Sequence, residues 1–214
     1  MPRSKSSRRW LDRQFSDPYV KRAQQEGYRS RAAYKLLEIQ EKDGVITPGM
    51  RILDLGAAPG SWSQIAARLA GPRGQVLALD LLDMEPIAGV TLLRGDFRED
   101  DVLADLRSRL GGMRLDLVLS DMAPNISGTA AVDQPRALYL AELTLDFARE
   151  CLKPGGAMVV KVFQGEGFDA LLRAMRASFD RVMSRKPRSS RPQSRELYLV
   201  AKGFRAGLHP GSVG

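Results

Sequence analysis

Short apolar segments of five to seven residues alternate with longer segments of helical character, and this alternation limits the fold more than any other feature. The apolar segments are expected as strands at 50–55, 75–80, 90–94, 115–120, 157–163, 181–185 and 197–202. The helical segments between them are expected at 30–42, 61–69, 101–110, 133–152 and 168–179. Because the inner strands are apolar throughout, they are expected to form a parallel sheet that helices cover on both faces.

The last two predicted strands are joined by a polar stretch, 186–195, which is too short for a crossover helix. They are therefore expected as an antiparallel hairpin at one edge of a mostly parallel, seven-stranded, Rossmann-like α/β sheet. In such a sheet the ligand lies beyond the carboxyl ends of the strands, at the switch point of the topology. We expect a basic extension at 1–27, one domain at 28–205 and a tail at 206–214.

The net charge of +8 is concentrated at the two ends of the chain. Residues 1–35 and residues 181–214 each carry a net charge of +7, whereas residues 36–180 carry −6. A mildly acidic body with two basic ends suggests that the ends hold a polyanion such as a nucleic acid. Basic tails that only aid solubility are the alternative interpretation.

Several classes of protein conflict with the composition. The chain has one cysteine, Cys151, and one histidine, His209, which argues against a disulfide framework, a zinc site and a Ser-His-Asp hydrolase. Its N-terminus lacks the apolar core of a secretory signal, and no apolar stretch approaches the length of a membrane helix. We expect a cytoplasmic protein without a metal, and a monomer, because no helix shows a spare apolar stripe.

A loop with two glycines follows the first inner strand and precedes a helix, in the sequence DLGAAPG. Gly56 and Gly60 allow a ligand to approach the backbone closely. The spacing differs from the dinucleotide fingerprint, and Pro59 removes an N–H that a pyrophosphate would need. The loop therefore favours a ligand without phosphates.

Acidic residues end the next two predicted strands. Asp80 is placed to accept hydrogen bonds from ribose hydroxyls, and Asp96 from an exocyclic amine such as that of adenine, with Phe97 nearby. A glycine loop followed by two such acids predicts an adenosine-type ligand without pyrophosphate, which points to S-adenosylmethionine. The glycine spacing also argues against an NAD-dependent oxidoreductase.

Lys161 is the most unusual residue, because it interrupts a strongly apolar strand, VVKVF. A lysine there is costly to bury unless it is paired or functional. Asp121 directly follows another inner strand. Asn125 stands where a base-amine methyltransferase would have an aromatic residue, and Cys151 is expected to pack rather than to act as a nucleophile. An oxygen acceptor remains, and its hydroxyl must lose a proton.

Four residues in long contexts resemble the Lys-Asp-Lys-Glu tetrad of ribose 2′-O-methyltransferases: Lys35 in RSRAAYKLLEI, Asp121 in SDMAPN, Lys161 in VVKVFQGEGF and Glu196 in SRELYLV. The motifs DLGAAPGSWSQ, LALDLL, GDF and SDMAPNISGTAAVD are similar to those of the bacterial FtsJ-type ribosomal RNA methyltransferase family. The resemblance runs from about Tyr28 to Gly203. It implies methyl transfer from S-adenosylmethionine to a uridine 2′-hydroxyl of 23S ribosomal RNA, in an assembled or nearly assembled large subunit.

With this resemblance, the tetrad is the expected catalytic set. The residues expected around the methyl donor are Asp54, Gly56, Ala57, Pro59, Gly60, Trp62, Asp80, Asp96, Phe97 and Asp121. The candidate RNA contacts are Arg8, Arg9, Arg29, Arg31, Arg185, Lys186, Arg188, Arg191 and Arg195. Tyr28, Tyr34 and Tyr198 are candidates for stacking on a base, and equally for the core.

The role of Lys161 stays open between a general base and a charged group that orients the acceptor. An ordinary lysine is neutral in only about 1 in 2,500 molecules at pH 7. Neighbouring cations favour the neutral form and neighbouring acids favour the charged form. A catalytically inactive RNA-binding assembly factor and a small-molecule O-methyltransferase are the alternative functions, disfavoured by the tetrad and by the basic ends respectively.

Overall fold

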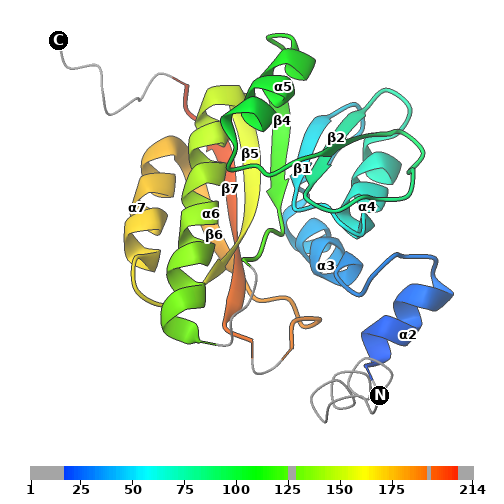
Figure 1. The fold of residues 1–214 in the computed structure, drawn as a ribbon, viewed down its shortest axis with the longest axis horizontal. Helices are drawn as coiled ribbons and strands as arrows, with labels where there is room; N and C mark the ends of the chain where they lie inside the picture. The colour runs from blue at the N-terminus through cyan, green and yellow to red at the C-terminus, as the bar shows by residue number, and fades with distance from the viewer. Residues whose placement is uncertain (1–16, 125–128, 192–193, 207–214) are drawn as a thin grey trace.

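The computed structural model describes residues 17–124, 129–191 and 194–206, and the candidate contacts Arg8 and Arg9 as well as Asn125 and His209 lie outside them (Figure 1). Helices and strands alternate along most of the chain, as expected. Their bounds are α2 (Pro18–Gln25), α3 (Ala33–Asp43), β1 (Arg51–Leu55), α4 (Ser61–Ala70), β2 (Gln75–Asp80), β3 (Val90–Arg94), α5 (Asp100–Leu110), β4 (Leu115–Ser120), α6 (Ala130–Cys151), β5 (Leu152–Phe163), α7 (Phe168–Ser178), β6 (Phe179–Arg185) and β7 (Glu196–Phe204).

Within the described ranges, the seven strands form one sheet in the order β3-β2-β1-β4-β5-β7-β6. The first five strands in this order run parallel to one another, and β7 is antiparallel to both β5 and β6. The predicted Rossmann-like sheet with a terminal antiparallel hairpin is thus confirmed. The order reverses between β1 and β4, so this pair marks the switch point at the carboxyl edge of the sheet.

Helices cover both faces of the sheet, which explains why its inner strands are apolar throughout (Figure 1). One core cluster joins the strands to α5, α6 and α7, with Leu106, Leu145 and Met175 from the helices. The other joins them to α3 and α4 through Leu36 and Ile65. Alternate residues of β4 and β5 enter the two clusters, so each inner strand is buried on both sides.

The expected N-terminal extension contains a helix, α2, which the sequence pattern did not reveal. Asp17 caps it by accepting a hydrogen bond from the Tyr19 amide at 3.0 Å, and Pro18 is its first residue. The ring of Tyr19 lies 5.4 Å from the ring of Tyr34 on α3, and Ala23 is buried. The Asp-Pro pair was therefore a start signal for a helix that packs on the domain.

A second difference concerns the segment after α6. Residues 153–156 were expected to separate the helix from the strand, and this prediction is wrong, because β5 begins at Leu152 directly after α6. Leu152 pairs with Leu115 of β4, and the register then shifts before Ala157 pairs with Leu117. The shift accommodates the proline and glycines as a bulge, in which Gly155 has a φ of 79°.

Candidate active site

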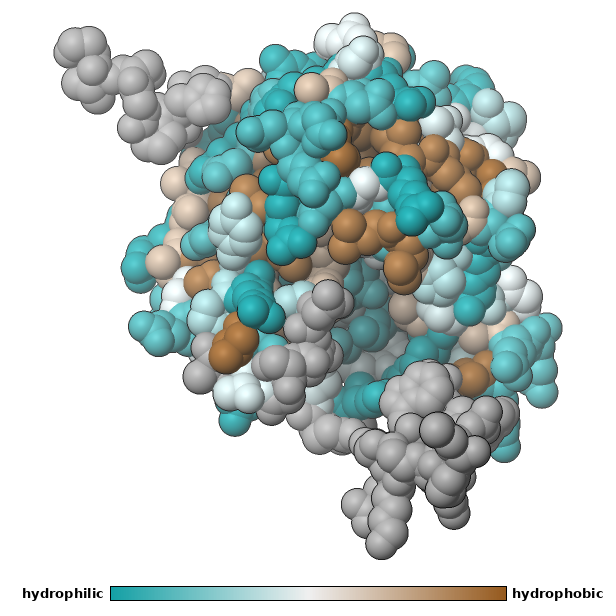
Figure 2. All heavy atoms as spheres, viewed as in Figure 1, coloured by the Kyte–Doolittle hydropathy of each residue, from teal (hydrophilic) through white to brown (hydrophobic). Residues whose placement is uncertain are grey.

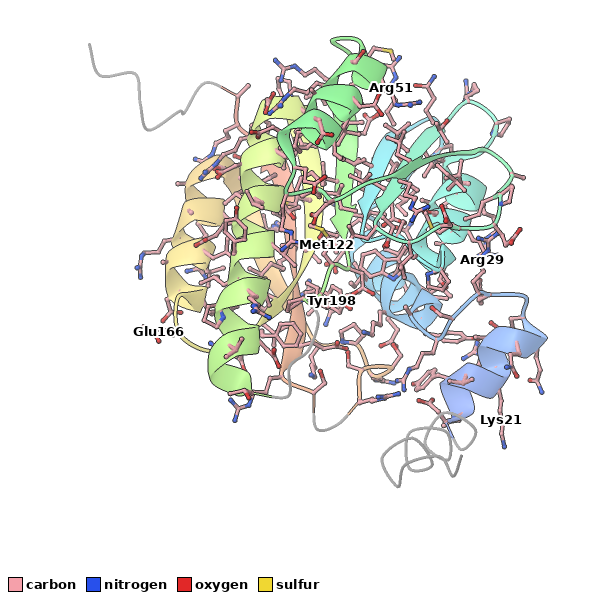
Figure 3. All side chains as sticks on the ribbon, in the orientation of Figure 1. Lys21, Arg29, Arg51, Met122, Glu166 and Tyr198 are labelled. Atoms are coloured by element: carbon pink, nitrogen blue, oxygen red, sulfur yellow. The ribbon has the colours of Figure 1, made fainter. Side chains whose placement is uncertain are left out.

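Two groups of predicted site residues meet at the carboxyl edge of the sheet, around the switch point between β1 and β4. Figure 3 shows Met122 and Tyr198 near the middle of this edge, with α3 beside it. Asp121 directly follows β4, and its backbone amide donates to the Leu55 carbonyl at the end of β1 at 3.2 Å. This bond fixes the first residue after β4 to the strand that leads into the glycine loop.

The glycine loop makes a tight turn after β1. The amides of Gly56 and Ala57 both donate to the Leu79 carbonyl, at 2.9 and 3.2 Å. Gly56 has a φ of 70°, and a Cβ there would lie 2.8 Å from the Met122 Cα, so only glycine fits. The loop backbone and the segment after Asp121 are therefore in close contact.

Asp80 is the last residue of β2, beside the glycine loop, and Asp96 lies two residues after the end of β3. Asp80 accepts hydrogen bonds from the amides of Ala58 and Leu82, both at 2.9 Å, which orient its half-buried carboxylate. The Arg98 side chain binds Asp96 through hydrogen bonds and charge, and it holds the pKa of that carboxyl below its usual value. Asp96 is therefore held as a carboxylate, and Asp80 is held in place by backbone amides.

Asp54 lies beneath the loop, with no exposed surface. Burial raises the pKa of its carboxyl to about 7, although the Ser63 hydroxyl donates to it at 2.6 Å. Its Oδ1 atom has no hydrogen-bond partner among the described residues. Ala57 is also buried, whereas Pro59 is exposed at the outer side of the loop.

Two aromatic residues expected at the donor have packing partners in the core. Trp62 is 2% exposed, and its indole N–H donates to the Ala32 carbonyl at 2.9 Å. Phe97 is buried and packs edge-on against Phe147, with the ring centres 5.5 Å apart. Both rings are therefore part of the packed core.

The first pair of the tetrad is Lys161 with Asp121. The Lys161 ammonium lies 2.9 Å from Asp121 Oδ1 and 2.5 Å from the backbone carbonyl of the same residue. Its side chain is 8% exposed, and that of Asp121 is 18% exposed. Burial alone would raise the pKa of Asp121, but the charges of Lys161 and Lys35 and two hydrogen bonds together lower it. Asp121 is therefore held as a carboxylate.

The second pair is Lys35 with Glu196. The Lys35 ammonium of α3 lies 2.8 Å from Glu196 Oε1 at the start of β7, and both side chains are largely buried. Burial alone would raise the pKa of Glu196, but the charge and hydrogen bond of Lys35 outweigh this effect, so the pKa is lowered. The two pairs affect each other. Lys35 also lowers the pKa of Asp121, and Lys161 also lowers the pKa of Glu196.

Tyr198 joins the two pairs. It stands opposite Lys161 in the β5–β7 ladder, and its hydroxyl donates to Asp121 Oδ1 at 2.7 Å. Its ring is fully buried between Trp62 and the Lys35 ammonium, whose nitrogen lies 5.6 Å from the ring centre. Stacking of Tyr198 on a base is therefore excluded. The alternation of the strand, with Glu196 and Tyr198 on one face, was a signal for this placement.

The other two tyrosines considered for stacking on a base, Tyr34 and Tyr28, differ from Tyr198 in their hydrogen-bond partners. Tyr34 is buried, and its hydroxyl donates to Glu26 Oε2 at 3.0 Å, so it belongs to the contact between α2 and α3. Tyr28 is partly exposed and accepts a hydrogen bond from Arg68 at 2.8 Å.

Four of the candidate RNA contacts bind within the protein. Arg29 donates to three backbone carbonyls, and Arg31 binds Asp17 and the Ser189 carbonyl. Arg185 forms an ion pair with Asp43 at 2.6 Å. Lys186 donates to the Ser194 and Glu196 carbonyls at 2.5 and 2.7 Å, which fixes the chain at the start of β7. These side chains organise the edge of the site.

The other described candidates lie on the connection between β6 and β7. Arg188 and Arg195 are exposed and Arg191 is half-buried. Glu38 of α3 anchors this connection by accepting the Arg188 and Ser189 amides at 2.6 and 2.9 Å. Sequence reasoning missed Glu38, because nothing in its local pattern marks it.

A groove of about 670 Å³ opens between α2, α3 and the start of the β6–β7 connection. Basic side chains predominate among its charged residues, which include Arg22, Lys42, Lys186, Arg188, Glu38 and Glu41. Figure 2 shows that hydrophilic side chains cover much of the viewed face, with an apolar patch near its centre. The groove adjoins the tetrad, because Lys186 also binds the Glu196 carbonyl.

Two features are absent from the part of the chain that the structure describes. None of its helices has the length and apolar character of a membrane span. It also contains no group of three or more His, Cys, Asp and Glu side chains arranged to hold a metal ion.

Comparisons with known proteins agree with this geometry. A family model described as FtsJ-like methyltransferase matches residues 28–204. The curated ribosomal RNA large subunit methyltransferase E of Pseudomonas aeruginosa (strain PAO1) is 58% identical over 205 residues, which cover 96% of this chain and 99% of that protein. The protein of the same name from Pseudomonas paraeruginosa (strain PA7) is also 58% identical over 205 residues.

Solved structures show the same fold. A crystal structure from Plasmodium falciparum, described as a ribosomal RNA methyltransferase, has a TM-score of 0.73 and 31% identity, and the match covers 83% of this chain and 98% of that chain. Fibrillarin of Aeropyrum pernix, solved with bound S-adenosylmethionine, has a TM-score of 0.52 and 16% identity over 79% of this chain and 75% of its own. The fibrillarin match is a likeness of fold alone.

Proposed function

The chain belongs to the FtsJ-like methyltransferase family, and from this premise we propose that it methylates large-subunit ribosomal RNA with S-adenosylmethionine as the donor. The acceptor is the ribose 2′-hydroxyl of a uridine in 23S ribosomal RNA. The substrate is the assembled or nearly assembled large subunit in the cytoplasm, and the enzyme acts as a monomer.

The observation that carries this proposal is the arrangement of two linked, largely buried ion pairs beside the glycine loop. Lys161–Asp121 and Lys35–Glu196 place two cations and two carboxylates at the carboxyl edge of the sheet. Burying four charges in a protein that only binds RNA would be costly without a function. A catalytically inactive assembly factor has no use for this arrangement.

The donor side suits an adenosine derivative. The side chains of Asp80 and Asp96 offer acceptor oxygens for ribose hydroxyls and for an exocyclic amine, and Gly56 and Gly60 let a ligand approach the loop. When bound, S-adenosylmethionine would supply the methyl carbon and its sulfur would keep the electron pair of the broken bond, while the ribose hydroxyl releases its proton to water.

We assign Lys161 the role of a charged orienting group. Its ammonium has three N–H donors, and the Asp121 carboxylate and carbonyl occupy two of them. The third is available to the acceptor oxygen. Asp121 is held as a carboxylate and lies 2.9 Å from this ammonium as its counter-charge. The ammonium then stabilises negative charge on the oxygen as its proton leaves.

Lys35 and Glu196 support this centre from the α3 side. Glu196 holds the Lys35 ammonium, and Lys35 in turn helps to keep Asp121 ionised. In this assignment the Lys35 ammonium attracts a phosphate of the RNA or the negative charge that develops on the acceptor oxygen. Glu196 holds that ammonium in place. Both residues therefore position the acceptor relative to Lys161.

The RNA strand is proposed to lie along the groove between α2, α3 and the β6–β7 connection. Arg22, Lys42 and Arg188 provide positive charge there, and Arg191 and Arg195 continue it along the connection. The basic N-terminal residues Arg8 and Arg9 are proposed as additional contacts. Binding through phosphates makes the affinity fall steeply as salt rises.

The function is tested by transfer of labelled methyl from S-adenosylmethionine to large ribosomal subunits that lack the modification. Free ribosomal RNA, small subunits and the Lys161→Ala variant are compared in parallel. Label in the large subunit, resistant to alkali at one dinucleotide and absent with Lys161→Ala, is the expected result. Label on a base, or transfer to a small-molecule hydroxyl instead of RNA, would refute the proposed acceptor. Donor binding without any transfer would favour the assembly-factor alternative.

A further inference from the structure

The side chain of Arg29 is committed to three backbone carbonyls at the outer side of the glycine loop. Its Nη1 atom donates to the Pro59 carbonyl at 3.0 Å and to the Glu85 carbonyl at 2.8 Å. Its Nη2 atom donates to the Pro86 carbonyl at 2.8 Å. One guanidinium therefore connects the glycine loop with the segment that follows β2, although these segments lie 26 or more residues apart in sequence.

The backbone around Arg29 is fixed as firmly as its side chain. The Arg29 amide donates to Gln64 Oε1 at 3.1 Å, and Gln64 Nε2 donates to the Gly27 carbonyl at 3.2 Å. The hydroxyls of Ser30 and Ser61 lie 2.8 Å apart. Together with the bond from Trp62 to the carbonyl of residue 32, these contacts attach the segment 27–32 to the first turn of α4.

This placement leaves Arg29 poorly suited to hold a phosphate. The side chain is half-buried, and a Cβ on Gly60 would lie 3.1 Å from its Nη1 atom, so the guanidinium is packed against the loop (Figure 3). A planar fork of donors suits several fixed carbonyls at once, which a lysine does not achieve. The same segment leads directly into α3, which carries Lys35.

We propose that Arg29 is a positioning residue for the methyl donor rather than an RNA contact. It holds the segment at Glu85 and Pro86 against Pro59, and so sets the width of the donor site between Gly60 and the residues that follow Asp80. Its own backbone is attached to the first turn of α4, so the guanidinium acts from a fixed position. This inference rests on the proposed use of S-adenosylmethionine as the donor.

The test compares Arg29→Met and Arg29→Lys with Arg68→Met as the matched control. Arg68 is exposed on α4 and donates to the Tyr28 hydroxyl of the same region, but it does not reach the donor loop. The dissociation constant of S-adenosylmethionine is measured by calorimetry without RNA. Amide hydrogen exchange of residues 82–89 is measured in the donor-free proteins, and kcat and both KM values follow from methylation of large subunits.

We expect Arg29→Met to weaken donor binding at least about tenfold, because several hydrogen bonds of a charged group are lost. Exchange at 82–89 should become faster, and the KM for the donor should rise while kcat at saturating donor and the KM for RNA change less than about twofold. Arg29→Lys should recover only part of the loss, and Arg68→Met should resemble the wild type. A general folding defect would instead lower the melting temperature and kcat together.

Donor affinity within about twofold of the wild type in Arg29→Met would overturn the inference, most clearly if the KM for RNA rises and Arg29→Lys restores it. That pattern belongs to a phosphate contact. A wild-type protein that binds no S-adenosylmethionine would instead refute the proposed function. The exchange measurement on the donor-free proteins would then still decide whether Arg29 holds the 82–89 segment.

Discussion

Removing both Lys161 and Asp121 should cost no more stability than removing either one, because the two charges are buried as a pair. The substitutions are Lys161→Met, Asp121→Asn and the double variant. Lys161→Met leaves the Asp121 carboxylate with the Tyr198 hydroxyl as its remaining donor on Oδ1. Asp121→Asn leaves the ammonium with the backbone carbonyl of residue 121. Each single variant thus leaves a charge without its counter-charge.

The separation of the charges sets the size of the effect. Two unit charges at the 2.9 Å found here attract by about 6 kcal/mol at an effective dielectric constant of 20. Partial exposure of both side chains and the remaining hydrogen bonds reduce this attraction, and about 3 kcal/mol is expected for each single variant. If the double variant also loses about 3 kcal/mol, the coupling free energy is about 3 kcal/mol.

The measurement is urea-induced unfolding of the four proteins at pH 7, repeated at lower pH. In the wild type the pKa of Asp121 is lowered, so its stabilising contribution is present above the unfolded value of about 3.9 and is lost as the pH falls through the folded value. In Lys161→Met the pKa of Asp121 should be higher than in the wild type, because only the charge of Lys35 and the hydrogen bond from Tyr198 then oppose the effect of burial. The deficit of this variant relative to the wild type should therefore shrink as the pH falls.

The exposed pair Arg107–Glu150 is the control, since its side chains are 48% and 49% exposed. A double-mutant cycle with Arg107→Met and Glu150→Gln should give less than about 1 kcal/mol of coupling. If the coupling of Lys161 with Asp121 is equally small, or if the deficit of Lys161→Met does not depend on pH, the reasoning is refuted. The tetrad would then be screened by solvent and would not hold Asp121 ionised.

Three further predictions follow from the same structure. Lys161→Arg should keep a measurable methylation rate, because a charged group is retained, whereas Lys161→Met should lose at least about 100-fold in kcat; an arginine variant as slow as the methionine variant would support a general base. Gly56→Ala should lower the melting temperature more than Gly112→Ala, since both have positive φ but only Gly56 faces the Met122 backbone; equal shifts would refute the close approach. Cys151, whose pKa burial raises to about 12, should react with a thiol reagent at pH 8 only after unfolding, and rapid reaction of the native protein would contradict its burial.

The sequence was most informative where one local pattern decides the structure. The bounds of β2, β3 and β4 agree with the predicted ones residue for residue, because each is a short apolar run between turn residues. Helix α2 was missed, since its few apolar residues, such as Tyr19 beside Tyr34 of α3, do not form a core stripe. The predicted start of β5 was wrong because a bulge in the sheet accommodates a proline and two glycines, which normally end a strand.

For the site, the sequence predicted which residues gather at the edge of the sheet but not how they pair. Strand ends in a parallel sheet converge by topology, so the proximity of Asp80, Asp96 and Asp121 followed from their positions alone. The pairing of Lys35 with Glu196 depends instead on how α3 lies over β7, which is a property of the packed molecule. The hydroxyl of Tyr198 could be assigned only once the register of β7 against Lys161 was known.

The arginines show why charge in a sequence is a weak guide to the site of RNA binding. A guanidinium that binds phosphate and one that binds carbonyls have the same sequence signature, because the five N–H donors suit either set of oxygens. Arg29 and Arg188 were predicted alike, yet one lies against fixed carbonyls and the other extends from an exposed connection. Backbone carbonyls become such partners only where the fold leaves them unpaired in loops, as at Pro59 and Pro86. The partners of each basic residue beside a ligand loop therefore have to be identified before that residue is assigned to RNA binding.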